Sequence, residues 1–373
     1  MTTLIIKNAV VYGKDFTPEK TDIEIEGEII KSLQKTDCVG EDFSGCVVLP
    51  GFIDIHIHGC NMSDVTSGKE DAALKMSEWL AQNGITSFCP TTMTLPVAML
   101  KSCFKYVADS MGKENGAYIH GINMEGPFIS PAKKGAQAEE HILNPDFEVF
   151  SELNAICPVK LVDIAPEMPD AHEFINKAKG ICTVSAAHTT ADYAQGKAAI
   201  ECGISHATHL YNAMNGLTSR EAGMVGAVLD SDKVNAELIC DGIHICPPTL
   251  RITFNALGED RTVVISDAMM AAGLADGEYT LGGQRVIKKG AARLEDGTLA
   301  GSATNLFEEF QNLISFGIPL KHAIKSVTIN PARAIGVDKI TGSIEVGKNA
   351  DLLILSEDFS QIKAVFVKGK RVR

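Results

Sequence analysis

The stretch LPGFIDIHIHG, residues 49–59, decides the fold of this chain. Its apolar residues predict a β-strand, and Pro50 and Gly51 mark the point where that strand begins. Residues two apart in a strand point to the same face, so His56 and His58 can offer ring nitrogens to one metal ion. The alternative is a pair of unrelated strand histidines, but further histidine-bearing strands follow downstream.

The middle of the chain alternates between strand-like and helix-like segments. Amphipathic stretches such as 69–82 and 95–110 separate the strands. This alternation predicts an α/β fold, a (β/α)8 TIM-like barrel over residues 49–342, with functional residues at the carboxyl ends of its strands. Gly-rich turns near 276–300 predict a small β insertion after the last strand. The eight strand-like runs are 46–58, 86–92, 118–124, 160–165, 181–187, 206–211, 235–241 and 262–267.

Both ends of the chain are β-rich. Alternating residues at 3–12 and 22–33 predict short half-buried strands before the barrel, and the last segment of the chain has the same character. The economical arrangement is a small β-sandwich domain built from residues 1–48 and 343–373, with the barrel inserted between them.

Composition limits the classes of function. The 373 residues are 45% hydrophobic and 22% charged, as in an ordinary globular protein. A net charge of −13 argues against a nucleic-acid surface, and any anionic substrate needs a local cluster of donors. No apolar run approaches the roughly 20 residues that span a bilayer, and no secretory signal is recognisable, so we expect a cytoplasmic protein without a membrane partner. Ten scattered cysteines without a C-x-x-C pair predict reduced thiols.

Three further strands end in residues that can bind a metal ion. Glu125 follows strand three, His188 follows strand five and His209 follows strand six. One carboxylate and two imidazoles suit zinc or ferrous iron, with positions left open for water or substrate. Asp267 ends strand eight across the barrel, where it can act as the base for a water molecule at the metal.

Taken singly, each of these residues has a structural explanation. A lone strand histidine is more often a core residue, and Asp267 could cap the following segment. Their common position at strand ends on one face of the barrel favours a metal centre instead. His206 lies three residues before His209, which predicts the opposite strand face. The other histidines are interpreted as structural or surface residues: His120, His141, His172 and His322.

The motifs of the chain together resemble those of the N-acetylglucosamine-6-phosphate deacetylase family within the amidohydrolase superfamily. The likeness covers nearly the whole chain. The motifs are EGPF at 125–128, HT at 188–189, HLYNAM at 209–214, DGIH at 241–244, SDAM at 266–269 and LAGS at 299–302.

This resemblance implies a role for each site residue. Glu125, His188 and His209 are expected to hold the catalytic metal, and Asp267 to act first as general base and then as general acid. Members with H-x-H on strand one resemble two-metal enzymes in which the glutamate bridges both ions. Since this chain has both His56 and His58, one or two zinc or iron ions per chain are expected.

The resemblance also implies how the phosphosugar is held. Arg220 resembles an arginine that reaches across a homodimer interface to the phosphate, with His244 and the Asn212-Ala213 segment completing that pocket. A guanidinium suits phosphate because it offers forked donors. Gln137 is a departure, because some family members place a histidine there to polarise the acetyl carbonyl, and a glutamine can donate a hydrogen bond but carries no charge.

The implied reaction is metal-dependent hydrolysis of N-acetylglucosamine 6-phosphate to glucosamine 6-phosphate and acetate. The galactosamine epimer is an alternative substrate. A cyclic-amide hydrolase of the same superfamily is a second alternative, but such enzymes carry a carboxylated lysine at the end of strand four, where this chain reads DIAPE at 163–167. A catalytically silent barrel with a binding role is the non-enzymatic alternative, and it would be expected to lack some of the ligands.

Overall fold

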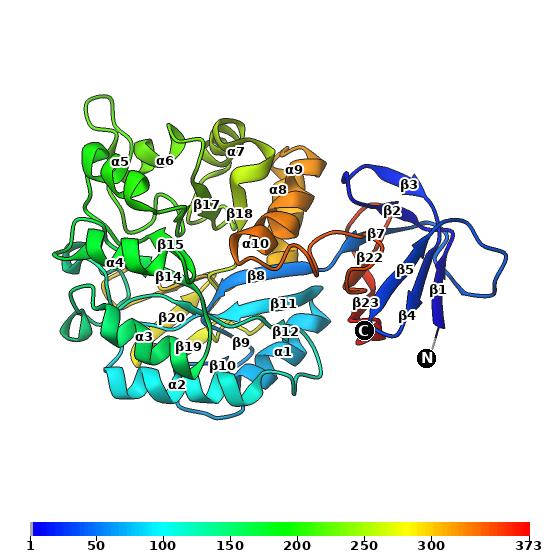
Figure 1. Cartoon of the computed structure of the whole chain (residues 1–373), viewed down its shortest axis with the longest axis horizontal. Helices are drawn as coiled ribbons and strands as arrows, with labels where there is room; N and C mark the ends of the chain where they lie inside the picture. Colours follow the sequence, from blue (N-terminus) through cyan, green and yellow to red (C-terminus); the bar gives the residue numbers. More distant parts are fainter. Residues whose placement is uncertain (1–2) are drawn as a thin grey trace.

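Parallel strands form the centre of the molecule, which is described here for residues 3–373 of a computed structural model (Figure 1). They make two parallel sheets, joined by single bridges between Thr91 and Asn123 and between Ile57 and Ala268. One sheet has the order β12 (Tyr118–Ile119), β11 (Ile85–Pro90) and β8 (Phe52–Ile57). The other has the order β13 (Ile122–Met124), β14 (Val159–Ile164), β15 (Thr183–Ala186), β16 (His206–Ala207), β17 (Asn235–Leu238) and β18 (Thr262–Val264).

Helices follow these strands along the chain, which confirms the expected α/β class. Their apolar faces pack inward, as α1 shows by burying Met76 and Leu80. No helix among residues 3–373 is both long enough and apolar enough to cross a lipid bilayer. The helices are α1 (Ala72–Gln82), α2 (Val97–Ser110), α3 (Phe147–Ile156), α4 (Ala171–Ala178), α5 (Tyr193–Cys202), α6 (Gly223–Leu229), α7 (Pro247–Arg261), α8 (Leu306–Ser315), α9 (Leu320–Val327) and α10 (Ile329–Ala334), with 3-10 turns η1 (Pro131–Lys133) and η2 (Glu139–His141).

The two ends of the chain meet at one side of the molecule, where N- and C-terminal strands lie side by side (Figure 1). They form two sheets around a hydrophobic cluster that includes Ile25, Leu352 and Phe366. The first sheet is β5 (Ile29–Leu33), β4 (Ile23–Glu26), β1 (Thr3–Lys7) and β6 (Glu41–Asp42). The second is β24 (Lys370–Arg371), β23 (Ile362–Val367), β22 (Leu352–Ser356), β7 (Cys46–Pro50), β2 (Val10–Tyr12) and β3 (Pro18–Lys20).

The run 46–58, expected as one strand, is two strands that belong to different sheets. β7 pairs with β22 and β2 in the terminal sheet, whereas β8 pairs with β11 in the parallel one. Gly51 lies between the two strands. A side chain would not fit at this position, because a Cβ there would lie 2.1 Å from the Thr86 hydroxyl oxygen. The chain therefore passes from one sheet to the other just before the H-x-H segment.

Two small antiparallel sheets lie near the carboxyl ends of the parallel strands. Residues 276–300 contain β19 (Gly277–Leu281), β20 (Gln284–Lys289) and β21 (Ala291–Arg293) in that spatial order. β9 (Gly59–Cys60) and β10 (Ser63–Asp64) form a two-stranded hairpin directly after β8.

Candidate active site

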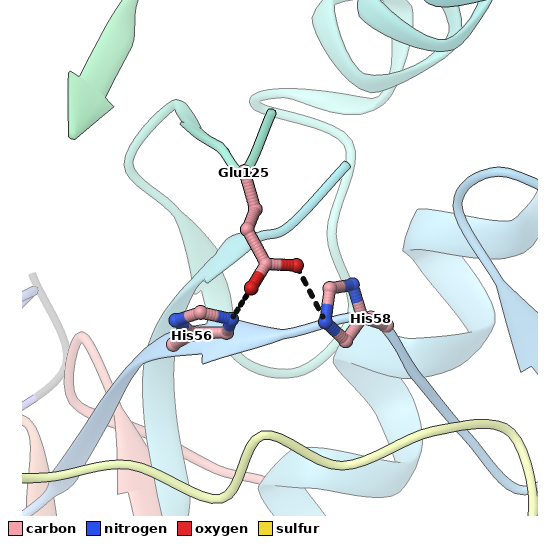
Figure 2. A group of neighbouring side chains, drawn as sticks. All are labelled: His56, His58 and Glu125. Atoms are coloured by element: carbon pink, nitrogen blue, oxygen red, sulfur yellow. Dashed lines mark ion pairs between the residues drawn. The ribbon is translucent and has the colours of Figure 1, made fainter. Parts of the chain in front are cut away.

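His56 and His58 project from β8 toward the carboxylate of Glu125, which follows β13 (Figure 2). His56 Nε2 lies 3.6 Å from Glu125 Oε1, and His58 Nε2 lies 3.3 Å from Glu125 Oε2. Gly126 lets the chain turn away at once, because its φ is 71° and a Cβ there would lie 2.1 Å from the Thr94 hydroxyl oxygen. The two histidines thus meet one carboxylate, as the period of a strand predicts.

His188 and His209 approach the same carboxylate from the other side. Their Nε2 atoms lie 3.0 Å and 3.1 Å from Glu125 Oε1 and 3.2 Å from each other. All of these side chains are buried, with at most 5% of any of the four histidines exposed. Glu125 therefore lies at the centre of a buried cluster to which β8, β13, β15 and β16 contribute.

The backbone is left-handed at three of the residues expected to hold the metal ion or act beside it. His188 has a φ of 43°, His209 a φ of 30° and Asp267 a φ of 46°. Left-handed residues other than glycine are uncommon and cost free energy, and they concentrate at functional sites. Each of these residues follows the end of its strand, so the strained backbone turns the side chain into the cluster.

Hydrogen bonds at Nδ1 orient three of the four rings. His56 Nδ1 lies 3.0 Å from a carboxylate oxygen of Glu237, His58 Nδ1 lies 3.3 Å from the Thr91 carbonyl, and His188 Nδ1 lies 2.8 Å from the Lys133 carbonyl. Each partner can only accept, so Nδ1 carries the proton and donates it. In the neutral ring, Nε2 then presents a lone pair toward Glu125.

The cluster fits a divalent metal ion. His56, His58 and Glu125 form one group of closely spaced ligand atoms, and Glu125, His188 and His209 form a second. His56 Nε2 is buried and has no hydrogen-bond partner among residues 3–373, as expected of an atom that binds an ion. Imidazole nitrogen and carboxylate oxygen are also the donors that such ions take.

Asp267 lies against the His56/His58 side of the cluster. Its Oδ1 is 3.2 Å from His58 Nε2 and 3.6 Å from His56 Nε2. Burial alone would raise the pKa of Asp267, but when His56 and His58 are both protonated, the hydrogen bond from His58 Nε2 and the positive charges of the two rings lower it below its usual value. A bound cation acts in the same direction, so this carboxylate is ionised and ready to accept a proton.

A cavity of about 320 Å³ opens above the cluster. Asp267, Glu125 and three of the histidines lie at its base, while Leu281 and Leu299 come from the segment that carries the small antiparallel sheet. Four residues expected to contact substrate also line it: Gln137, Asn212, Ala213 and His244. The cavity thus joins the metal-binding side chains to the polar residues expected around a sugar.

Arg220 is the candidate that the chain does not bring to this cavity. It lies exposed in the loop before α6, and its backbone N–H is 3.4 Å from the Thr218 hydroxyl. Within one chain, no described contact connects its guanidinium to the metal-binding cluster or to the cavity lining. A role for Arg220 in this site therefore requires a second chain.

Gln137 and His244 are both held by neighbouring groups. The Gln137 amide oxygen accepts from the Thr94 backbone N–H at 2.6 Å, so its NH₂ group faces Glu125 Oε2, also at 2.6 Å. His244 Nδ1 donates to the Asp241 carboxylate at 2.7 Å, which leaves Nε2 for another partner. Gln137 thus engages the proposed metal ligand, a contact that its expected role at the acetyl carbonyl does not include.

Glu237 was not identified from the sequence, and the placement of His206 differs from expectation. Glu237 is fully buried in β17 and bonds His56 Nδ1 with one oxygen, while its other oxygen lies 3.2 Å from His206 Nε2. His206 therefore contacts the site through Glu237 instead of facing away from it. The alternation of side chains between the two strand faces does not extend to His209, because β16 ends at Ala207 and the backbone at His209 is left-handed. A glutamate within an apolar strand was the available signal.

Comparison with known proteins supplies independent information. The chain matches the Amidohydrolase family over residues 47–372. It is 38% identical over 328 residues to the N-acetylglucosamine-6-phosphate deacetylase of Bacillus subtilis (strain 168), covering 86% of this chain and 83% of that protein. It is 33% identical over 330 residues to the N-acetylgalactosamine-6-phosphate deacetylase of Escherichia coli, covering 87% of each. The crystal structure of N-acetylglucosamine-6-phosphate deacetylase from Pasteurella multocida has 30% sequence identity and a TM-score of 0.93, and the match covers 99% of both chains.

Proposed function

The chain belongs to the amidohydrolase family, and we propose that it hydrolyses the acetamide of N-acetylglucosamine 6-phosphate to glucosamine 6-phosphate and acetate. The observation that carries this proposal is the convergence of Glu125, His188 and His209 within hydrogen-bond distance of one another, beside Asp267 at the base of a cavity. Deacetylases of this phosphosugar are also among its relatives over most of the chain.

The proposed architecture is a closed barrel with a terminal sandwich. Bridges from Thr91 to Asn123 and from Ile57 to Ala268 join the two parallel sheets to each other, and β12 and β13 both fall within the expected strand 118–124, which supports eight strand positions in a (β/α)8 barrel over residues 49–342. The two terminal sheets share a hydrophobic cluster from both ends of the chain, which supports a small β-sandwich domain from 1–48 and 343–373. All the proposed site residues then lie at the carboxyl ends of barrel strands.

Glu125, His188 and His209 would hold the catalytic ion, and His56 and His58 with Glu125 would hold a second ion where one binds. A divalent ion at such a site supplies Lewis acidity, which lowers the pKa of water and polarises a carbonyl. Zinc and iron both accept these nitrogen and oxygen donors. The proposed cofactor is therefore one or two zinc or iron ions per chain.

Asp267 moves the proton. It accepts a proton from the attacking water as the new C–O bond forms at the acetamide carbon, and it delivers that proton to the nitrogen as the C–N bond breaks. Its Oδ1 is the oxygen closest to His56 and His58, which leaves Oδ2 to exchange the proton. Burial of the site excludes bulk water from competing with this transfer.

The phosphate is held at the mouth of the cavity. His244 Nε2 and the Asn212-Ala213 segment face that space, and Arg220 from a second chain of a homodimer completes the pocket. Asp241 fixes the His244 ring, because it accepts the Nδ1 proton. In a chain with a net charge of −13, these dedicated donors offset the long-range repulsion of an anionic substrate.

The alternatives differ in the features they need. A relative that acts on the galactosamine epimer keeps N-acetylgalactosamine 6-phosphate as a second candidate substrate. A cyclic-amide hydrolase would need a lysine where β14 ends, and residues 163–167 contain none. A silent binding protein would have no need for the complete set of ligands and base found here.

A panel of N-acetylated hexosamines tests the proposal. Acetate release by the metal-replete protein is measured for the glucosamine and galactosamine derivatives, each with and without the 6-phosphate. We expect the phosphorylated glucosamine derivative to have the highest kcat/KM. Equal rates without the phosphate would refute the Arg220 and His244 assignments, and no acetate release from any member would refute the deacetylase proposal.

A further inference from the structure

Glu237 lies directly beneath the candidate metal centre and has no place in the proton transfer or in the cavity lining. Its side chain is fully buried in β17. One oxygen lies 3.0 Å from His56 Nδ1 and 3.4 Å from the His209 backbone N–H, and the other lies 3.2 Å from His206 Nε2. A buried carboxylate with both oxygens occupied is held in one orientation.

The carboxylate distinguishes His56 from the other three histidines. His58 and His188 donate their Nδ1 protons to backbone carbonyls, and His209 Nδ1 has no partner among residues 3–373. A hydrogen bond to an ionised acceptor is roughly twice as strong as one between neutral groups. A carboxylate at Nδ1 also makes the ring a better metal ligand and fixes its orientation.

His56 depends on this support more than its neighbours do. Its Nε2 is 3.6 Å from both Glu125 Oε1 and Asp267 Oδ1, whereas the Nε2 atoms of His58, His188 and His209 all lie within 3.3 Å of a carboxylate oxygen of the cluster. No other hydrogen bond to the His56 ring is present among the described residues. Glu237 is therefore the one group that can fix the tautomer and the position of this ring.

We propose that Glu237 is a positioning residue that enables the His56, His58 and Glu125 group to retain a second divalent ion. The ion at Glu125, His188 and His209 depends on it much less, because Glu237 contacts neither histidine ring of that group and reaches it only through the His209 backbone N–H, at 3.4 Å. The inference rests on the metal-binding part of the proposed function but not on the identity of the substrate.

The test counts metal ions and measures their affinities. Wild-type protein and Glu237→Gln are loaded with Zn²⁺ and dialysed, the bound ions are counted by elemental analysis, and each dissociation constant is measured by competition with a chelating dye. Glutamine has the same shape, but its NH₂ group must face one of two histidine donors. We expect two ions in the wild-type protein, and in the variant a roughly 10- to 100-fold weaker affinity for one ion only.

Glu309→Gln is the matched control. Glu309 is equally buried, accepts from the Cys240 backbone N–H at 2.7 Å and touches none of the candidate ligands. Burial raises the pKa of Glu309 well above its usual range, which favours the neutral carboxyl group that the amide of glutamine resembles. This variant is expected to bind both ions as the wild type does.

The proposal is overturned if Glu237→Gln binds both ions with unchanged affinity, or if the wild-type protein binds only one. Should Glu237→Gln fail to fold, Glu237→Asp keeps the charge but withdraws it from His56 by one methylene, and it must weaken the same ion. Because these measurements need no substrate, a two-ion protein that releases no acetate would contradict the deacetylase proposal and leave this one standing.

Discussion

The two halves of the candidate metal centre share Glu125 but are built in different ways. His56 and His58 come from one strand, two residues apart, so the period of a strand brings their rings together. His188 and His209 are 21 residues apart in sequence and follow two different strands. The backbone of each of these two residues is left-handed. The first half can be recognised from local spacing, whereas the second depends on the parallel arrangement of neighbouring strands.

The two halves also differ in the groups that hold their histidine rings. In the first half, Glu237 and the Thr91 carbonyl hold the histidine rings, and Asp267 lies alongside. In the second, the Lys133 carbonyl holds His188, and His209 Nδ1 has no partner within residues 3–373. We expect the second half to be essential for catalysis, because the proposed catalytic ion binds there. We expect the first half to depend on the groups that hold its histidine rings.

Removing a ligand from the second half is expected to have the largest effect. His209→Gln takes away a nitrogen donor 3.1 Å from Glu125, so the catalytic ion is lost together with its several kcal/mol of charge stabilisation. Acetate release should fall by at least ~10³-fold. The check is kcat together with ion content, and a variant that keeps both would contradict the assignment of this half.

Removing the base is expected to have the next largest effect. Asp267→Asn leaves all the histidines and Glu125 in place but cannot accept a proton, so kcat should fall by at least ~10²-fold. Ion content should remain that of the wild type, which separates this variant from His209→Gln. Near-normal turnover would eliminate Asp267 as the base.

Removing a ligand from the first half sharpens the comparison. His56→Gln leaves Glu125, His188 and His209 intact, so we expect one ion to be lost and kcat to fall by only roughly 10-fold, the size of effect seen when support for a metal site is removed. Elemental analysis and acetate release measure the two effects. A loss as large as that of His209→Gln would mean that the halves are functionally equivalent.

Replacement of Gln137 is expected to have the smallest effect, which is a change in the free energy of unfolding. Gln137→Leu removes the acceptor of the Thr94 N–H, and a buried donor without a partner should lower the free energy of unfolding by ~1–3 kcal/mol. Urea denaturation measures the change. Gln284→Leu removes a half-buried amide that donates to the Ala136 carbonyl and makes no hydrogen bond to Glu125, and it should cost less. Equal costs would show that the contact of Gln137 with Glu125 and Thr94 is unimportant.

The sequence allowed much of the fold to be predicted, for identifiable reasons. Apolar runs that end in polar or charged residues indicated the strands, because buried parallel strands need apolar side chains on both faces. Pro50 and Gly51 were recognised as a strand entrance, but the assignment of 46–50 to a different sheet was missed, since 46–50 and 52–57 are similarly apolar and only pairing partners distinguish them. Sequence periodicity does not report which sheet a strand joins.

The candidate site was predictable only in part. His56 and His58 followed from spacing, while Glu125, His188 and His209 required the assumption that strand ends meet at one rim. The contacts of Glu237 with His56 and His206 could not be inferred, because the three residues lie on three strands with no common motif, and a glutamate in an apolar strand indicates a buried carboxylate without naming its partners. The alternation of side chains along a strand held for His56 and His58 but failed between His206 and His209, where the backbone of His209 is left-handed.

Dependence of acetate release on metal tests the central claim most directly. The protein is stripped with a chelator, and acetate release from N-acetylglucosamine 6-phosphate is followed while Zn²⁺ or Fe²⁺ is added in steps to two equivalents per chain. We predict no turnover by the stripped protein, with most of the activity restored by the first equivalent. Full activity of the metal-free protein would contradict the account.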